Sequence, residues 1–197
     1  MVRKSIQISC YVVFPMMIGL ACVAGPLINL LLTDKWSTAV PIVQIFAFAY
    51  MCQPIQTISA QAIKALGNSK KILQLEIIRK AIELSLLIIS LPFGITTIAF
   101  SSMIAGVLSC IISMRPNKRL FNYKYREQLK DIGIPFLLSI CMGGIVFIIG
   151  IGINSYLIKI CVQVLVGIGV YLGISIISKN SIYVYLRSCL TEIRKKG

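Results

Sequence analysis

A long apolar segment bounded by charges lies near the start of the chain. Residues 5–33 are 29 consecutive residues without Asp, Glu, Lys or Arg, and they lie between Arg3-Lys4 and Asp34-Lys35. A helix needs about 20 apolar residues to cross a hydrocarbon core of roughly 30 Å, so this segment can span a membrane. Similar uncharged blocks recur along the 197 residues, of which 57% are hydrophobic. The sequence therefore predicts an all-α integral membrane protein.

Six spans account for these blocks. Residues 84–114 are uncharged, but they are too many for one span and too few for two. A break at Leu91-Pro92-Phe93-Gly94 divides them between two helices, the first of which has charged residues in its first half. The predicted spans are residues 6–32, 41–63, 72–91, 94–114, 132–153 and 156–178, followed by a basic amphipathic cytoplasmic tail at residues 179–197.

The distribution of Lys and Arg provides an independent test of this number. Cytoplasmic loops retain positive charge during insertion, whereas short translocated loops do not. With six spans, 18 of the 20 Lys and Arg residues lie on one side, and only Lys35 and Lys159 lie on the other. A single long helix at 84–114 would abolish this asymmetry. We therefore expect both termini on the cytoplasmic side of the membrane.

Composition also bounds the chemistry. The net charge of +14 is explained by the cytoplasmic loops and by attraction to membrane lipid, and no segment is long enough to form a soluble nucleic-acid-binding domain. The chain has no His, and its 7 Cys residues are scattered without a Cys-x-x-Cys pair. We therefore expect no metal site, no cofactor, no nucleic-acid partner and no enzymatic activity.

Polar side chains in the second predicted span form one candidate site. Gln53, Gln56, Thr57 and Lys64 occupy helical positions that share a face. Polar groups at membrane depth are costly, so such a stripe predicts a water-filled cavity that offers hydrogen bonds to sugars or phosphates. The alternative is a structural role, in which these groups form hydrogen bonds between helices.

The third predicted span carries a charged face. Glu76, Arg79, Lys80 and Glu83 have a spacing that favours ion pairs between residues four apart, Glu76 with Lys80 and Arg79 with Glu83. A self-paired face near the interface is one interpretation. In the other, Arg79 or Lys80 contacts an anionic pyrophosphate, because guanidinium and ammonium groups bind phosphate well.

Small residues and prolines indicate packing faces and bends. Gly106 belongs to a row of small residues in the fourth predicted span, and Gly169 and Gly173 form a Gly-x-x-x-Gly in the sixth. Both patterns predict close contact between helix backbones. Pro54 predicts a break or bend in the second span.

Several strings of residues resemble the polysaccharide-biosynthesis flippases, which are O-antigen and exopolysaccharide exporters of the MATE-like superfamily. These strings are Phe14-Pro15-Met16-Met17-Ile18-Gly19-Leu20, Ala24-Gly25-Pro26-Leu27-Ile28, Thr33-Asp34-Lys35-Trp36, Ala39-Val40-Pro41-Ile42-Val43-Gln44-Ile45, Lys64-Ala65-Leu66-Gly67-Asn68-Ser69-Lys70, Leu75-Glu76-Ile77-Ile78-Arg79-Lys80 and Pro92-Phe93-Gly94-Ile95. The resemblance implies translocation of undecaprenyl-pyrophosphate-linked oligosaccharide from the inner to the outer leaflet, without ATP hydrolysis by the protein itself.

The length differs from that of the family. Its members have two lobes with 12 to 14 helices, and this chain resembles the last six helices of a 14-helix version. The resemblance therefore implies a fragment, a truncated product or one part of a split transporter, whose missing N-terminal lobe would be a separate partner chain.

Three other functions remain open. A multidrug exporter of the same superfamily has the same helical pattern. A membrane enzyme of polysaccharide assembly would need large outer loops with acids and arginines, whereas the predicted outer loops are short. A non-transporting membrane fragment would only pack against or associate with other proteins.

Overall fold

The computed structural model describes residues 2–121, 123–153, 155–177 and 182, and the regular structure in these residues is entirely helical. This result confirms the predicted all-α fold class. The elements are α1 (Val2–Leu32), η1 (Asp34–Ala39), α2 (Val40–Met51), α3 (Gln53–Ala65), α4 (Ser69–Ser90), η2 (Leu91–Phe93), α5 (Ile95–Phe121), α6 (Tyr125–Ile151) and α7 (Tyr156–Ile177).

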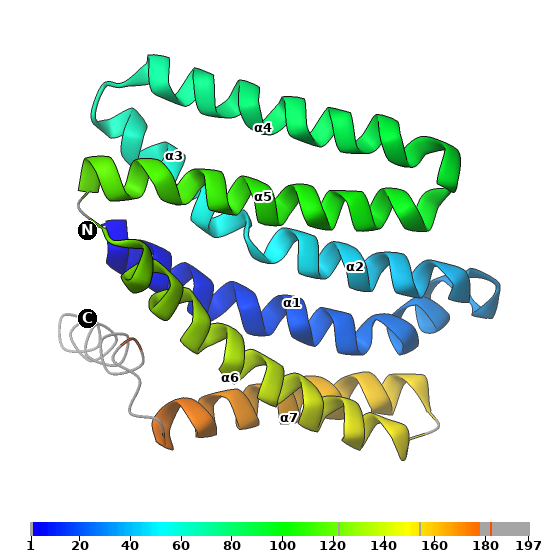
Figure 1. The fold of residues 1–197 in the computed structure, drawn as a ribbon. Coiled ribbons are helices and arrows are strands. Elements are labelled where there is room, and N and C mark those ends of the chain that lie inside the picture. The colour runs from blue at the N-terminus through cyan, green and yellow to red at the C-terminus, as the bar shows by residue number, and fades with distance from the viewer. Residues whose placement is uncertain (1, 122, 154, 178–181, 183–197) are drawn as a thin grey trace.

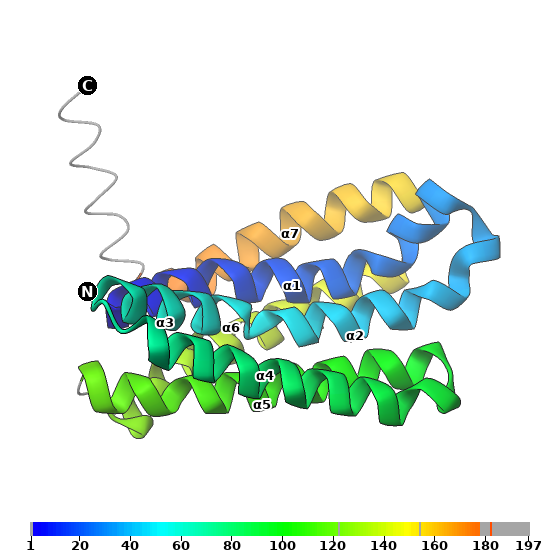
Figure 2. The same cartoon turned by 90° about the horizontal axis from the view of Figure 1, so that it is seen from above.

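Within the described residues, five helical segments are long and apolar enough to cross a membrane, which indicates a multi-pass membrane protein. They are Val2–Leu32, Asp34–Ala65, Ile95–Lys118, Tyr125–Ile151 and Tyr156–Ile176. The span predicted at residues 72–91 is a helix, α4, but its charged first half keeps it outside this set. Its 22 residues extend about 33 Å, and it lies beside α5 along its whole length (Figures 1 and 2).

The helix ends differ from the predicted ones. The fourth and fifth spans were expected at residues 94–114 and 132–153, whereas α5 continues to Phe121 and α6 begins at Tyr125. Hydropathy gives the bounds of the apolar segment, not those of the helix. Polar turns that extend the helix beyond that segment are therefore not predicted. The predicted amphipathic tail at 179–197 lies outside the described residues, apart from Ile182.

A break divides the second predicted span, 41–63, into α2 and α3. Cys52 lies between them, and Pro54 occupies the first turn of α3. Proline has no backbone N–H and is best accommodated in the first turn of a helix, which agrees with the start of α3 next to Pro54. Pro15 and Pro26, in contrast, lie inside the continuous helix α1.

The buried core is built around α1. Ile6, Cys10, Phe14 and Ile18 repeat at intervals of four and form a buried stripe on this helix. α1 packs against α2 and α3 and also against α6 and α7, which cross it on another side (Figure 1). A second group consists of α5 with α2, α3 and α4 around it. Many apolar side chains on the outer faces of α4 and α7 are exposed, as lipid-facing surfaces require.

Only one of the two predicted small-residue contacts forms in the described part of the chain. A Cβ atom added at Gly106 of α5 would lie 2.8 Å from the carbonyl oxygen of Ala49 in α2, so the two backbones are in close contact. Gly169 and Gly173 in α7 have no atom within 4 Å of such a Cβ. The Gly-x-x-x-Gly face of α7 therefore has no packed neighbour among the described residues, which differs from the predicted close contact with another helix.

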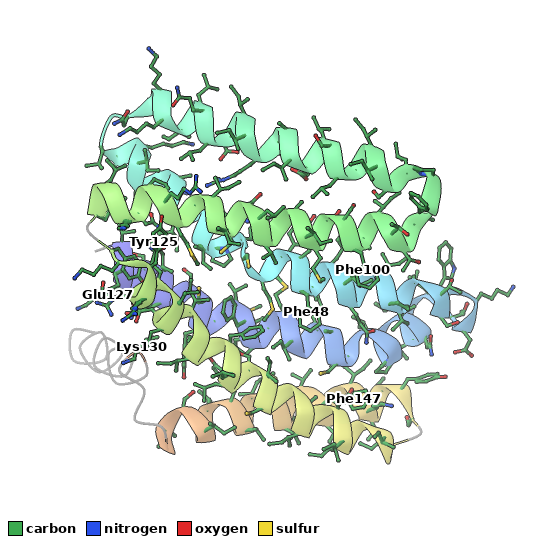
Figure 3. All side chains as sticks on the ribbon, viewed as in Figure 1. Phe48, Phe100, Tyr125, Glu127, Lys130 and Phe147 are labelled. Atoms are coloured by element: carbon green, nitrogen blue, oxygen red, sulfur yellow. The ribbon has the colours of Figure 1, made fainter. Side chains whose placement is uncertain are left out.

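The connections alternate between the two ends of the bundle. The start of α1, the α3–α4 and α5–α6 connections and the end of α7 all lie at the end marked N in Figure 1. Figure 3 places Tyr125, Glu127 and Lys130 at this end and Phe147 towards the other. The predicted basic clusters at the start of α1, α4 and α6 thus share one end of the bundle.

An ion pair joins α1 to α6 at this basic end. The Arg3 guanidinium donates to both carboxylate oxygens of Asp131, over 2.6 and 3.2 Å, and the Tyr123 hydroxyl donates to the same carboxylate over 2.7 Å. The Arg3 side chain also lies over the Tyr123 ring, 5.6 Å from its centroid. Burial and the hydrogen bond to Asp131 raise the pKa of Tyr123, so its hydroxyl remains a donor at neutral pH.

Candidate functional site

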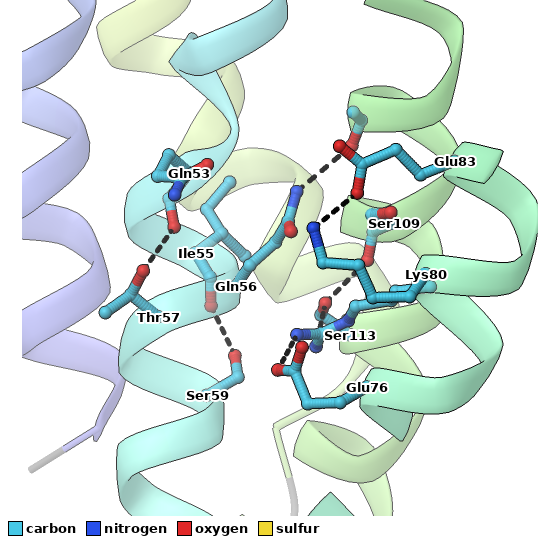
Figure 4. Close-up of polar contacts among 12 residues, drawn as sticks. Gln53, Ile55, Gln56, Thr57, Ser59, Glu76, Lys80, Glu83, Ser109 and Ser113 are labelled. Atoms are coloured by element: carbon cyan, nitrogen blue, oxygen red, sulfur yellow. Dashed lines mark hydrogen bonds and ion pairs between the residues drawn. The ribbon is translucent and has the colours of Figure 1, made fainter. Parts of the chain in front are cut away.

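A polar cavity of about 520 Å³ lies between α3, α4 and α5, next to the end of α2. All six residues predicted as site candidates line it, which are Gln53, Gln56, Thr57, Lys64, Arg79 and Lys80. The folded chain therefore brings together two polar faces that are separate in the sequence. Figure 4 shows Gln56 of α3 and Lys80 of α4 extending into the space between the two helices.

The α3 wall begins at the break at Cys52. Gln56 Nε2 donates to the carbonyl oxygen of Gly106 in α5 over 3.2 Å, and Thr57 Oγ1 donates to the carbonyl oxygen of Gln53 over 3.0 Å. The side chains of Gln53 and Thr57 are exposed, whereas Gln56 is half-buried. Both interpretations of the stripe thus have support, because Gln56 joins two helices and its neighbours on α3 face the cavity.

Arg79 is the buried cation of the α4 wall. It is 6% exposed, and it donates from Nη1 to Glu76 Oε1 over 3.0 Å and from Nη2 to Ser113 Oγ over 2.6 Å. Its Nε is buried without a hydrogen-bond partner in the described residues. A guanidinium that keeps an unused donor beside a polar cavity is well suited to bind an anion.

Lys80 and Glu83 form the second, more exposed pair of α4. Lys80 Nζ donates to Glu83 Oε2 over 2.6 Å, and both side chains are more than half exposed. The ion pairs therefore join residues three apart, Glu76 with Arg79 and Lys80 with Glu83, instead of the predicted pairs four apart. Arg79 turns towards Ser113 in α5, and this orientation brings it closer to Glu76 than to Glu83.

α5 supplies the back of the site. Ser113 accepts from Arg79 and donates to the carbonyl oxygen of Ser109 over 2.6 Å. One turn further on, Asn117 Nδ2 donates to Ser59 Oγ of α3 over 2.8 Å, and Asn117 and Ser59 are fully buried. Ser113 belongs to the row of small residues that predicted packing in the fourth span, and Asn117 lies beyond the predicted end of that span at residue 114. Their recurrence at intervals of four with Ser109 was the available signal for a polar helix face.

Lys64 completes the set near the basic end. It lies in the last turn of α3, and its side chain is exposed. The partial negative charge at the C-terminus of a helix favours a cation at this position. The five charged residues that line the cavity are Lys64, Glu76, Arg79, Lys80 and Glu83. Three are cations and two are anions, so the cavity carries a net positive charge.

A second cavity of about 530 Å³ is almost entirely apolar. It lies between α1, α6 and α7, and its lining includes Met16, Leu20 and Ile168. The buried amide of Gln163 also lines it, and Gln163 Nε2 donates to the carbonyl oxygen of Val146 over 3.3 Å. Periodicity of single helices could not predict this cavity, because it forms where α6 and α7 cross α1 (Figure 1).

Comparison with known proteins supports one part of the resemblance. Residues 1–41 match a family described as "Polysaccharide biosynthesis protein". The matched segment includes α1, η1 and the first residues of α2, but none of the residues that line the polar cavity. The curated proteins and the solved structures contain no significant match to this chain. The family match supports a role in polysaccharide synthesis or export.

Proposed function

We propose that this chain is part of an exporter of lipid-linked oligosaccharides. It would move undecaprenyl-pyrophosphate-linked glycan units from the inner to the outer leaflet of a bacterial cytoplasmic membrane, for synthesis of a surface polysaccharide such as O-antigen, capsule or exopolysaccharide. The observation that carries this proposal is the polar, net positive cavity beside α3, α4 and α5 in a chain otherwise suited to lipid. The family match over residues 1–41 supports the polysaccharide part of the proposal.

The cavity offers the two kinds of contact that such a substrate needs. Arg79 and Lys80 provide cations for a pyrophosphate. Gln53, Gln56 and Thr57 provide amide and hydroxyl groups, which form hydrogen bonds with sugar hydroxyls. A transport role follows more directly than catalysis, because this set binds and orients a substrate but includes no pair suited to proton transfer or nucleophilic attack.

The orientation and the sixth span are part of the same proposal. α4 lies beside α5 and turns its charged face towards the cavity, so it can cross the membrane while its apolar side faces lipid. The shared basic end of the bundle would then face the cytoplasm, with both termini on that side.

Epitope tags inserted after Thr33 and after Asn154 test this orientation. Both positions follow predicted outward-facing helix ends, so antibodies or proteases added to intact spheroplasts should reach the two tags. A tag inserted after Gly67, in the α3–α4 connection, is the matched control and should become accessible only after the membrane is permeabilised. Protection of the first two tags in intact spheroplasts would contradict the orientation.

Further helices are needed to close the cavity. Gln53, Thr57, Lys80 and Glu83 are exposed in the described chain, and at membrane depth such groups require water or polar partners. We propose that a second lobe, on a separate chain or on the same polypeptide, covers this side. The partners of the chain would then be membrane lipid, the lipid-linked oligosaccharide and that lobe, and no nucleic acid.

Substitution of Arg79 in the chromosomal gene tests the site. Arg79→Gln removes the buried cation, and because charge-assisted hydrogen bonds contribute about 1.5–3 kcal/mol, we expect export to fall at least about tenfold. Lys80→Gln should have a smaller effect, because Lys80 is exposed. Surface polysaccharide and accumulated lipid-linked intermediates are the measurements. Lys71→Gln, at the start of α4 outside the cavity, is the control and should export normally. Normal export by Arg79→Gln at a normal protein level would refute the proposal.

A further inference from the structure

The hydrogen bonds of Arg79 divide its guanidinium into a fixed and an exchangeable side. A guanidinium has five N–H donors in a rigid fork, and it cannot lose its charge in a protein. Nη2 is bound to Ser113, Nη1 is bound to Glu76, and Nε is buried without a hydrogen-bond partner in the described residues. These three nitrogens therefore have three different environments.

The Ser113 side is the fixed one. Ser113 is fully buried, and its hydroxyl both accepts from Arg79 and donates to the carbonyl oxygen of Ser109. No cavity solvent reaches Ser113, and both of its partners belong to packed helices. This contact positions Arg79 whether or not a ligand is present.

The Glu76 side is the exchangeable one. The Glu76 side chain is 45% exposed and lines the cavity, whereas the Arg79 side chain is 8% exposed. A carboxylate on a flexible side chain can rotate into solvent at little cost, and Lys64 and Lys80 are other cations that line the same cavity. An anion that enters the cavity therefore meets Arg79 where Glu76 is bound.

We propose that Glu76 is an internal competitor that an anionic ligand must displace from Arg79. The inference rests on the proposed function, because it assigns to the same cavity a selection for phosphate groups carried by lipids. Replacement of one carboxylate by another gives little net gain, since each would accept from the same Nη1 of Arg79. A phosphate ester offers more negative charge and more acceptor oxygens than a carboxylate, so it can displace Glu76.

Direct binding tests this competition. The full chain is incorporated into phosphatidylcholine nanodiscs, and its affinity for radiolabelled geranylgeranyl pyrophosphate is measured. Glu76→Gln removes the competing charge but keeps the shape of the side chain, and we expect binding about tenfold tighter, because the lost hydrogen bond to a charged group contributes about 1.5 kcal/mol. Arg79→Gln should weaken binding. In the Arg79→Gln background, Glu76→Gln should give no gain, because the competition acts through Arg79.

Glu83→Gln is the matched control, since it removes the same charge from the same cavity but from the exposed pair with Lys80. If Glu83→Gln tightened binding as much as Glu76→Gln, the effect would come from the overall charge of the cavity, and the inference would be overturned. Unchanged binding in Glu76→Gln, with weaker binding in Arg79→Gln, would refute the competition alone. Unchanged binding in Arg79→Gln would refute the site in the proposed function.

A second arm identifies the source of the phosphate. Nanodiscs that contain phosphatidylglycerol present a bulk lipid phosphate in large excess. If the site selects the pyrophosphate of an isoprenyl carrier, phosphatidylglycerol should compete weakly, which supports both the inference and the proposed function. Full competition would overturn the assignment to lipid-linked pyrophosphate, and an Arg79-dependent gain in Glu76→Gln would then still support displacement of Glu76.

Discussion

Gly106→Val is expected to destabilise the bundle by about 3 kcal/mol, at the upper end of the range for overpacked sites. Even the first atom of the new side chain would lie 2.8 Å from the carbonyl oxygen of Ala49. That neighbour is backbone, so it cannot turn aside, and α2 and α5 would have to separate. Gly106 also accepts the hydrogen bond from Gln56 Nε2 of α3, so a shift of α5 at this residue would strain one wall of the polar cavity.

Thermal unfolding in detergent, followed by size-exclusion chromatography of the remaining folded fraction, measures this effect. Gly169→Val in α7 is the matched control, because a Cβ atom there has no neighbour within 4 Å. The control should unfold close to the wild-type midpoint. Equal midpoints for Gly106→Val and Gly169→Val would show that α2 and α5 do not approach as closely as described.

Asp131→Leu is expected to have the second largest effect, a loss of about 2 kcal/mol. Removing one partner of a fully buried pair costs about 3–5 kcal/mol, and here solvent reduces the cost because the Arg3 side chain is 49% exposed. The substitution removes the acceptor of Arg3 and Tyr123 together, so the buried Tyr123 hydroxyl would lose its partner. We therefore expect the basic ends of α1 and α6 to separate at lower temperature.

Glu127→Gln separates this specific contact from the general effect of lost charge. Glu127 lies 4.0 Å from Arg3 and its side chain is 42% exposed, so its replacement should change stability by less than about 0.5 kcal/mol. The same detergent assay measures both variants. Similar midpoints for Asp131→Leu and Glu127→Gln would mean that the Arg3–Asp131 pair adds nothing beyond a surface charge.

Local patterns in the sequence predicted the features that depend on one helix at a time. Uncharged length located the apolar helices, and Pro54 located the break between α2 and α3. The positions of Gln56 and Arg79 at helical spacing predicted polar faces, and these faces meet in one cavity. Helical periodicity and the cost of polar groups in lipid are sufficient for predictions of this kind.

Features that depend on contacts between helices could not be predicted in the same way. Arg3 and Asp131 are 128 residues apart, and nothing in either local pattern indicates the other. The choice of Glu76 over Glu83 as the partner of Arg79 depends on Ser113, which only the packing of α5 against α4 places there. The apolar character of α7 likewise does not reveal that its Gly-x-x-x-Gly face has no neighbour among the described residues.

The interruption at Cys52 frees the two halves of this span from a common helical phase. In one continuous helix every side chain would be fixed at steps of about 100° from the last, so the residues that anchor α2 would also dictate which residues of α3 face the cavity. With the break, the 13-residue helix α3 can present different side chains to the cavity while α2 keeps its position. Ligand preference could thus diversify in evolution while the neighbouring anchor in the bilayer stays the same.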